Sequence, residues 1–244
     1  EEEEAISSPS TTQTAVDLSL QEKFITPLKN QSDQISTWKK IAEANIQKKN
    51  FLAAGKALQE AAQIKANDAS LYYEASRTYS LAGNQRAALV MIQRAIALDP
   101  NNMTYLKASA SLANWVGDSS IVYSSNQKIL QIQSNDKEAT LALGDYYGDK
   151  ADYKSAKQLY QHYLSTYGND KDILLSYIRS AAWDNDYASE QKLLENYKTI
   201  FGIDDNYLTE KARLLTFTNQ PKEGLTLANE LLKKYPNNQD LNSI

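Results

Sequence analysis

One turn-forming segment recurs every 34 residues along this chain of 244 residues, and no other feature constrains the fold as strongly. Its residues are chiefly Pro, Gly, Asn and Asp, which favour turns and supply the capping side chains of helices. A fixed period of this length is typical of a repeat protein, in which each repeat is one supersecondary element. The six segments are Ala66-Asn67-Asp68, Pro100-Asn101-Asn102, Ser134-Asn135-Asp136, Gly168-Asn169-Asp170, Gly202-Ile203-Asp204 and Pro236-Asn237-Asn238.

A second series of capping residues lies midway between these segments. Five of its six members are Asn or Asp, the types preferred at helix N-caps, and each precedes an apolar run. The sixth is followed by Pro221 at a first-turn position, where its missing N–H costs nothing. We therefore predict two helices in every repeat. The six residues are Asn50, Asn84, Asp118, Asp152, Asp186 and Gln220.

Apolar residues recur at helical spacing between the two series. Position 1 of the six repeats falls at Ile35, Ala69, Met103, Lys137, Lys171 and Asp205. We expect the first helix to bury positions 4, 7, 8 and 11, and the second helix to bury positions 17, 20, 24 and 27. Positions 8 and 20 are mostly small, which lets the two helices of a repeat approach closely.

This pattern resembles the tetratricopeptide repeat (TPR), whose signature is Trp-x₂-Leu-Gly-x₂-Tyr, then Ala-x₃-Phe-x₂-Ala, then Pro. The resemblance implies an all-α fold, a right-handed superhelical α-solenoid of antiparallel helix pairs, with repeats at 35–68, 69–102, 103–136, 137–170, 171–204 and 205–238. The matching residues are Leu143, Gly144, Tyr147, Ala156 and Tyr160 in one repeat, and Tyr72, Tyr79, Ala88, Ile92, Ala95 and Pro100 in another.

Three residues depart from the pattern. Asn126 occupies a large apolar position, Glu190 a small one, and Lys211 a core position of the last repeat. We expect those repeats to be locally loosened or shifted.

The segments outside the repeats are less regular. Residues 1–14 are acidic and then rich in Ser and Thr, which indicates a flexible linker. Apolar side chains recur at four-residue spacing at Val16, Leu20, Phe24 and Leu28, so we predict a short capping helix and a connector over residues 15–34. Residues 239–244 are interpreted as the truncated start of a further helix. The alternative is that an uncapped end mediates contact between molecules.

The tyrosine content follows from the same register. The chain has 16 tyrosines against 4 phenylalanines, and eleven of the tyrosines fall at positions predicted to be buried. A buried ring with a hydroxyl that reaches water suits a layer only two helices thick. The eleven are Tyr72, Tyr79, Tyr147, Tyr153, Tyr160, Tyr163, Tyr167, Tyr177, Tyr187, Tyr197 and Tyr235.

Composition excludes several classes of function. The net charge of −4 argues against a nucleic-acid binder with a basic face, and no apolar run is long enough to span a bilayer. There is no cysteine and only one histidine, His162, which we interpret as a surface residue. The acidic turns Asp184-Asn185-Asp186 and Asp204-Asp205 are interpreted as helix caps, since neither forms a calcium-binding loop. We therefore expect no enzymatic activity, no cofactor and no metal.

The beginning of the chain bears on its location. It starts at Glu1 rather than methionine, and the absence of cysteine suits an exported bacterial protein better than a cytosolic one. We expect an extracytoplasmic bacterial domain, with a membrane anchor or another domain upstream. A trimmed flexible terminus is the equally weighted alternative.

The resemblance also implies where a partner binds. In TPR proteins, positions 2, 5, 9, 12 and 13 face the concave groove that holds a partner peptide or helix. Arginine recurs here at position 9 and an aromatic residue at position 13, and both types are enriched in binding hot spots. Such a groove favours a peptide with carboxylates and apolar anchors. The residues implied are Lys39, Glu43, Tyr73, Arg77, Lys107, Asn114, Trp115, Asp145, Arg179, Trp183, Arg213 and Phe217.

Several alternatives stay open beside this scaffold function. The aromatic residues at position 13 could simply pack between repeats, the ends could mediate self-association, or the chain could regulate a catalytic or membrane domain outside it. One narrower hypothesis fails. TPR proteins that bind the acidic tails of heat-shock chaperones use a Lys/Asn/Arg clamp. At the matching positions, Lys39, Glu43, Glu74, Thr104 and Ala108, only the first agrees.

Overall fold

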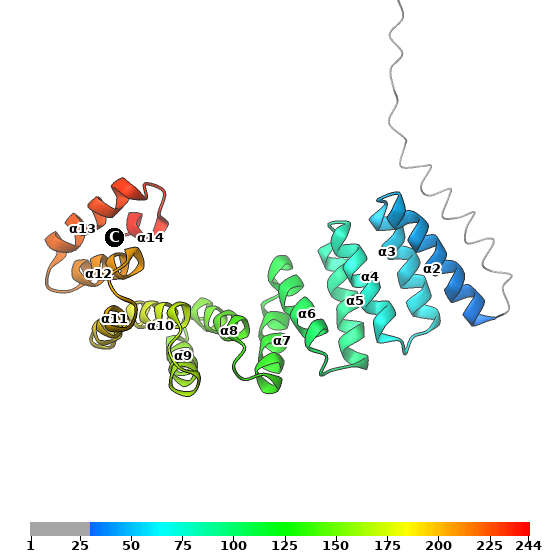
Figure 1. Cartoon of the computed structure of the whole chain (residues 1–244), viewed down its shortest axis with the longest axis horizontal. Helices are drawn as coiled ribbons and strands as arrows, with labels where there is room; N and C mark the ends of the chain where they lie inside the picture. The colour runs from blue at the N-terminus through cyan, green and yellow to red at the C-terminus, as the bar shows by residue number, and fades with distance from the viewer. Residues whose placement is uncertain (1–29) are drawn as a thin grey trace, which may run out of the picture. The chain divides into compact units, whose positions relative to one another are not determined.

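The computed structural model describes residues 30–244 and contains thirteen α-helices, with no strand, in that part of the chain (Figure 1). The predicted linker 1–14 and most of the predicted capping segment 15–34 lie outside the described residues. The helices are α2 (Gln31–Gln47), α3 (Phe51–Ile64), α4 (Ala69–Leu81), α5 (Gln85–Leu98), α6 (Met103–Val116), α7 (Ser119–Ile132), α8 (Lys137–Asp149), α9 (Tyr153–Tyr167), α10 (Lys171–Trp183), α11 (Tyr187–Phe201), α12 (Asp205–Phe217), α13 (Pro221–Lys234) and α14 (Gln239–Asn242).

Both series of capping residues begin helices in the structure. Asn50 Oδ1 accepts from the backbone N–H of Ala53, and Asp152 Oδ1 accepts from that of Ser155. Asp170 caps α10 in the same way, because its carboxylate accepts from the backbone N–H groups of Asp172 and Ile173. Gln220 has no capping hydrogen bond, and α13 begins with Pro221 instead. The side chains that satisfy the free N–H groups of each first turn therefore fix where the helices start.

Helix α2 begins earlier than position 1 of the first repeat. It starts at Gln31 rather than Ile35, and Asn30 caps it by accepting from the backbone N–H of Ser32 at 2.9 Å. Residues predicted to form a connector thus form its first turn. The Asn side chain supplies the N-cap, which explains the earlier start.

The described residues divide into two compact units, one that ends at Val116 and one that spans Gly117–Ile244, and their boundary falls inside the predicted repeat 103–136. In the first unit, α2 to α6 pack in chain order, each helix against the next (Figure 1). Alanine dominates this core: Ala54, Ala57, Ala61, Ala75 and Ala88 are fully buried. Small side chains at these places allow close helix packing.

The second unit contains α7 to α14, again with each helix packed on its neighbour in sequence. The first helices of successive repeats also contact one another, α8 on α10, α10 on α12 and α12 on α14. Leucine and isoleucine dominate this core: Leu174, Ile178 and Leu194 form one buried cluster with Tyr197. The short helix α14 covers the last helix pair, because Leu241 is buried beside Ala212, Ala228 and Leu231.

The small residues at positions 8 and 20 act as predicted. A Cβ atom on Gly144 would lie 1.7 Å from Oη of Tyr160, and one on Gly224 would lie 2.5 Å from the backbone nitrogen of Thr216. Helices α8 and α9, and likewise α12 and α13, therefore approach so closely that these positions admit no side chain.

Asn126 and Glu190, which depart from the repeat pattern, are both buried; the Asn126 amide donates to the carbonyl of Val122 within α7 at 2.8 Å. The boundary between the two compact units falls inside the repeat that carries Asn126, which agrees with the expected loosening of that repeat. The prediction for two tyrosines is wrong. Tyr167 and Tyr235, predicted to be buried, are exposed. Each lies at the end of a second helix. The Tyr167 hydroxyl donates to Ser134 in the turn before its repeat, and the Tyr235 hydroxyl donates to Asp205 at the start of its repeat. These two rings join the ends of repeats rather than fill a core.

Candidate partner-binding face

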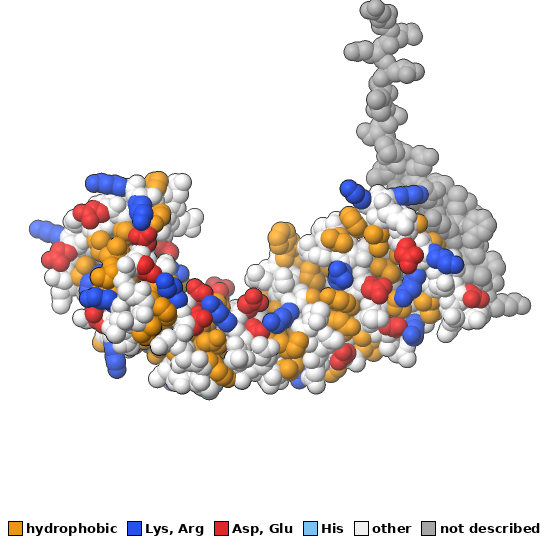
Figure 2. Space-filling view, viewed as in Figure 1, with side chains coloured by type: hydrophobic (Ala, Val, Ile, Leu, Met, Phe, Trp, Pro, Cys, Tyr) orange, Lys and Arg blue, Asp and Glu red, His pale blue; other side chains and the backbone are white. Residues whose placement is uncertain are grey.

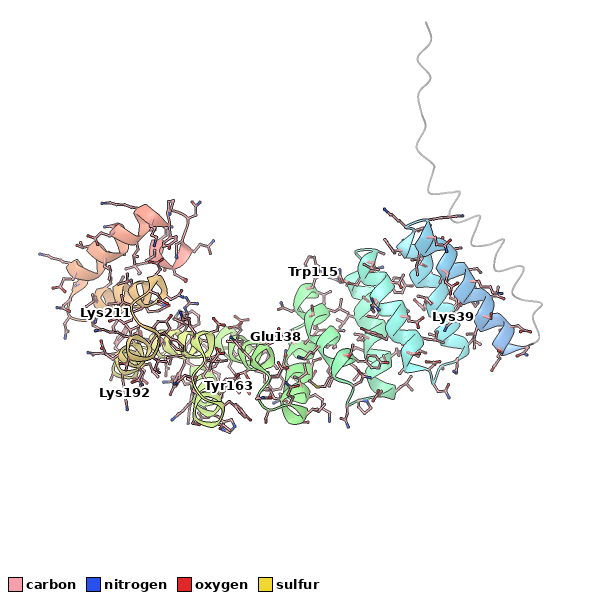
Figure 3. The ribbon with its side chains drawn as sticks, viewed as in Figure 1. Lys39, Trp115, Glu138, Tyr163, Lys192 and Lys211 are labelled. Atoms are coloured by element: carbon pink, nitrogen blue, oxygen red, sulfur yellow. The ribbon has the colours of Figure 1, made fainter. Side chains whose placement is uncertain are left out.

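All of the residues that the resemblance assigns to the groove lie on first helices, namely α2, α4, α6, α8, α10 and α12. We call the members on α2, α4 and α6 the first-unit face, and those on α8, α10 and α12 the second-unit face. Figure 3 shows Lys39 midway along α2 and Trp115 at the end of α6.

The first-unit face centres on a pair of tyrosine rings tilted against each other. The ring of Tyr73 on α4 lies 5.0 Å from that of Tyr105 on α6, and the guanidinium of Arg77 lies 5.8 Å above the Tyr73 ring. Burial raises the pKa of Tyr105, with further contributions from Asp99 and Tyr73. Arg77 thus binds an aromatic ring within its own helix. The other members of this face vary in exposure: Lys39 is half-buried, whereas Glu43, Lys107, Asn114 and Trp115 are exposed.

Three large aromatic residues at position 13 reach solvent. Trp115 is 77% exposed, Trp183 is 53% exposed and Phe217 is 52% exposed. Trp183 also packs partly between repeats, since its ring lies 6.3 Å from that of Tyr153 and its Cζ3 would be 3.9 Å from a Cβ on Gly148. Trp and Phe are among the residue types enriched at protein–protein interfaces. Figure 2 shows apolar side chains reaching the surface of both units.

The arginines of the second-unit face are bound to a buried carboxylate. Arg179 Nε donates to Glu210 Oε1 at 2.8 Å, and Arg213 Nη2 donates to Glu210 Oε2. The Glu210 side chain is 0% exposed, so its charge depends on these two partners. Arg179 also lies 3.8 Å from Asp240 of α14. The structure brings Arg179 and Arg213 together, because both donate to the buried carboxylate of Glu210.

A second carboxyl group is buried beside this cluster. Glu190 on α11 is 0% exposed, and neither of its carboxyl oxygens has a hydrogen-bond partner. Burial raises the pKa of Glu190 to about 7; Arg213 opposes the shift and Glu210 adds to it. An unpaired buried carboxyl group favours its neutral form, because the charged form loses its hydration.

Two further carboxylates lie one helical turn apart on α8. Asp145 and Asp149 both reach solvent, and partial burial and the charge of Asp149 raise the pKa of Asp145, while Arg179 lowers it. Asp149 follows Gly148, over which the Trp183 ring lies. The two carboxylates and the indole therefore occupy the same part of the second-unit face.

The structure offers no group of three metal-ligating side chains anywhere within residues 30–244. His162 is exposed, with its ring 6.5 Å from that of Tyr167. The acidic turns have structural partners: Asp184 and Asp186 bind Lys157 at 2.6 and 3.0 Å, and Asp204 caps α12.

Some residues of these faces were missed by sequence reasoning. Leu81 stands at position 13 of its repeat, like the three aromatics, and is exposed, so the register alone could have identified it. Glu210 stands three residues before Arg213, a spacing that brings two helical side chains together. Its contact with Arg179 of the preceding repeat requires the packed structure, and no signal in the sequence indicates it.

Comparisons with known proteins support the fold. No known family model matches the sequence, and no curated protein does. Solved structures do match. A chain in the structure of Naa15/Naa10 bound to HypK-THB is 17% identical with a TM-score of 0.66, covering 92% of this chain and 34% of that chain.

Two TPR-like structures match over nearly their whole length. YrrB, described as a TPR protein with an unusual peptide-binding site, is 13% identical with a TM-score of 0.57, covering 77% of this chain and 96% of its own. The Pseudomonas aeruginosa protein pilF is 14% identical with a TM-score of 0.55, covering 88% and 98%. This chain therefore has the all-α solenoid fold of TPR proteins. Among its described residues, no helix combines the length and apolar character needed to cross a membrane.

Proposed function

We propose that this chain is a protein-interaction scaffold that holds a segment of a partner protein against the first helices of its repeats. The observation that carries the proposal is the exposure of Trp115, Trp183 and Phe217, which occupy one position of the repeat and lie at the ends of α6, α10 and α12. Exposed aromatic rings supply large contact areas with little loss of side-chain entropy on binding.

The fold supports the same proposal. Stacked helix pairs present extended surfaces on which a peptide or helix can lie, and solenoid proteins commonly use them for binding. YrrB, which shares the fold, is described as having a peptide-binding site. The residues of this chain that we propose as contacts are those of the first-unit and second-unit faces.

Affinity capture from the source organism tests the proposal. The bait is the full chain as wild type, as Trp183→Ala/Phe217→Ala, or as a control with Ile200→Ala/Leu225→Ala. The control pair is also apolar and exposed, but lies on the second helices α11 and α13. We expect wild type and control to retain the same partners and the first-helix variant to lose them. Equal recovery by all three baits would contradict the proposal.

A further inference from the structure

The second-unit face has more carboxyl groups than cations. Five carboxyl groups on or beside this face, those of Asp145, Asp149, Glu190, Glu210 and Asp240, interact with one another or with the guanidinium groups of Arg179 and Arg213. Even with Glu190 neutral, four carboxylates share two positive charges. The cluster is therefore negative, although the sequence suggests a row of arginines.

The two arginines cannot easily receive a carboxylate from a partner. Both donate to Glu210, whose side chain is 0% exposed. If an incoming carboxylate displaced Glu210, a buried charge would be left without a partner, which is strongly destabilising. The accessible carboxylates of this cluster are those of Asp145, Asp149 and Asp240.

The carboxylates of Asp145 and Asp149 lie beside an aromatic ring. One edge of the Trp183 indole lies near Gly148, and Gly148 stands between Asp145 and Asp149 in the sequence of α8. About half of the Trp183 side chain is exposed to solvent. A carboxylate next to an aromatic face suits a guanidinium or ammonium group, because the cation gains an ion pair and a cation–π contact together. Phe217 on the neighbouring helix α12 offers an apolar contact.

We propose that the second-unit face docks a basic partner segment, in which an Arg or Lys side chain lies between Asp145, Asp149 and Trp183 and an apolar side chain packs on Phe217. This inference rests on the proposed function and specifies the class of partner. It reverses the charge expected from the arginines alone. Charge complementarity is the argument for the occupant: a net negative face attracts a positive segment and repels an acidic one.

A metal ion fits this face poorly, since the described residues hold no group of three suitable ligands. An anionic lipid surface or a nucleic acid would meet like charge here. A basic protein segment is the partner that meets both the carboxylates and the aromatic rings.

The test is a selection from a random peptide library displayed on phage, with the full chain as the target. Selected peptides are then synthesised and their affinities measured for wild type, Asp145→Asn/Asp149→Asn and Trp183→Ala. The matched control is Glu223→Gln/Glu230→Gln, which removes two exposed carboxylates from the second helix α13. Circular dichroism verifies that every variant is folded.

We expect the selected peptides to be basic and to bind about tenfold more weakly to the Asp145→Asn/Asp149→Asn and Trp183→Ala variants, but equally well to the control. Acidic or uncharged peptides that depend on Trp183 would overturn the basic-partner inference and leave the proposed function standing. Peptides that bind equally well to wild type and Trp183→Ala, or a failure to select any, would overturn both.

Discussion

At the scale of single residues, the spacing between helices is set by a few positions where a side chain is missing. Gly144 and Tyr160 illustrate this: the Tyr160 hydroxyl occupies the space that a Cβ of residue 144 would need. The tyrosine is almost fully buried, so its ring fills the gap left by the glycine. The repeat pattern predicted a small residue at the position of Gly144 and a large buried one at the position of Tyr160, because it specifies side-chain size at fixed positions.

This contact leads to a prediction with an internal control. A Gly→Ala change within a helix normally stabilises it by about 0.5–1 kcal/mol. Gly148→Ala should follow that rule, because its Cβ would meet only Trp183 at 3.9 Å. Gly144→Ala should instead destabilise the protein by about 1–3 kcal/mol, since the Tyr160 ring must move. Urea denaturation measures both changes, and equal effects would refute the packing of α8 on α9.

Residue patterns were less informative where side chains make polar contacts. Tyr167 and Tyr235 stand at positions predicted to be buried but lie at helix ends. Their hydroxyl groups donate to Ser134 of the preceding repeat and to Asp205 at the start of the same repeat, respectively. Position in a repeat fixes which way a side chain points. It does not fix whether a neighbouring helix is long enough to cover it.

At the scale of helices, the junction of α10, α11 and α12 differs from the other repeats. Ile178 and Glu190 occupy positions 8 and 20 of this repeat, where small residues stand in most others. The Glu190 carboxyl therefore lies among buried groups, close enough to Arg213 and Glu210 for their charges to affect its pKa. The sequence marks Glu190 as unusual. Its environment depends on Glu210 and Arg213 from the next repeat.

Glu190 should make stability depend on pH. Its pKa is raised from 4.5 to about 7 in the folded chain, so the folded state binds a proton that the unfolded state releases. The stabilisation is complete below about pH 4.5 and is lost as the pH rises through about 7. We expect the free energy of unfolding to fall by roughly 1–2 kcal/mol between about pH 6 and pH 8.

Glu190→Gln should remove most of this dependence, because the amide does not ionise in that range. Glu230→Gln, an exposed residue on α13, should leave it intact. Denaturation curves at several pH values compare the three proteins. If Glu190→Gln keeps the slope of the wild type, Glu190 is not a buried neutral acid.

At the scale of the whole chain, the period of the sequence specifies the order and type of the helices, because capping residues and core positions repeat together. It also places every candidate contact on a first helix. It does not specify the charge of the resulting face. Arg179 and Arg213 look like free cations in the sequence, yet packing brings Glu210 between them.

The central claim is that partners bind to the first helices. Photo-crosslinking in the presence of the captured partner tests it most directly, with a benzophenone amino acid placed singly at Trp115, Trp183 or Phe217 on the first helices, or at Ile200 or Leu225 on the second helices. We predict partner adducts from the first-helix positions and none from the second-helix positions. Adducts formed mainly from Ile200 or Leu225 would contradict the claim.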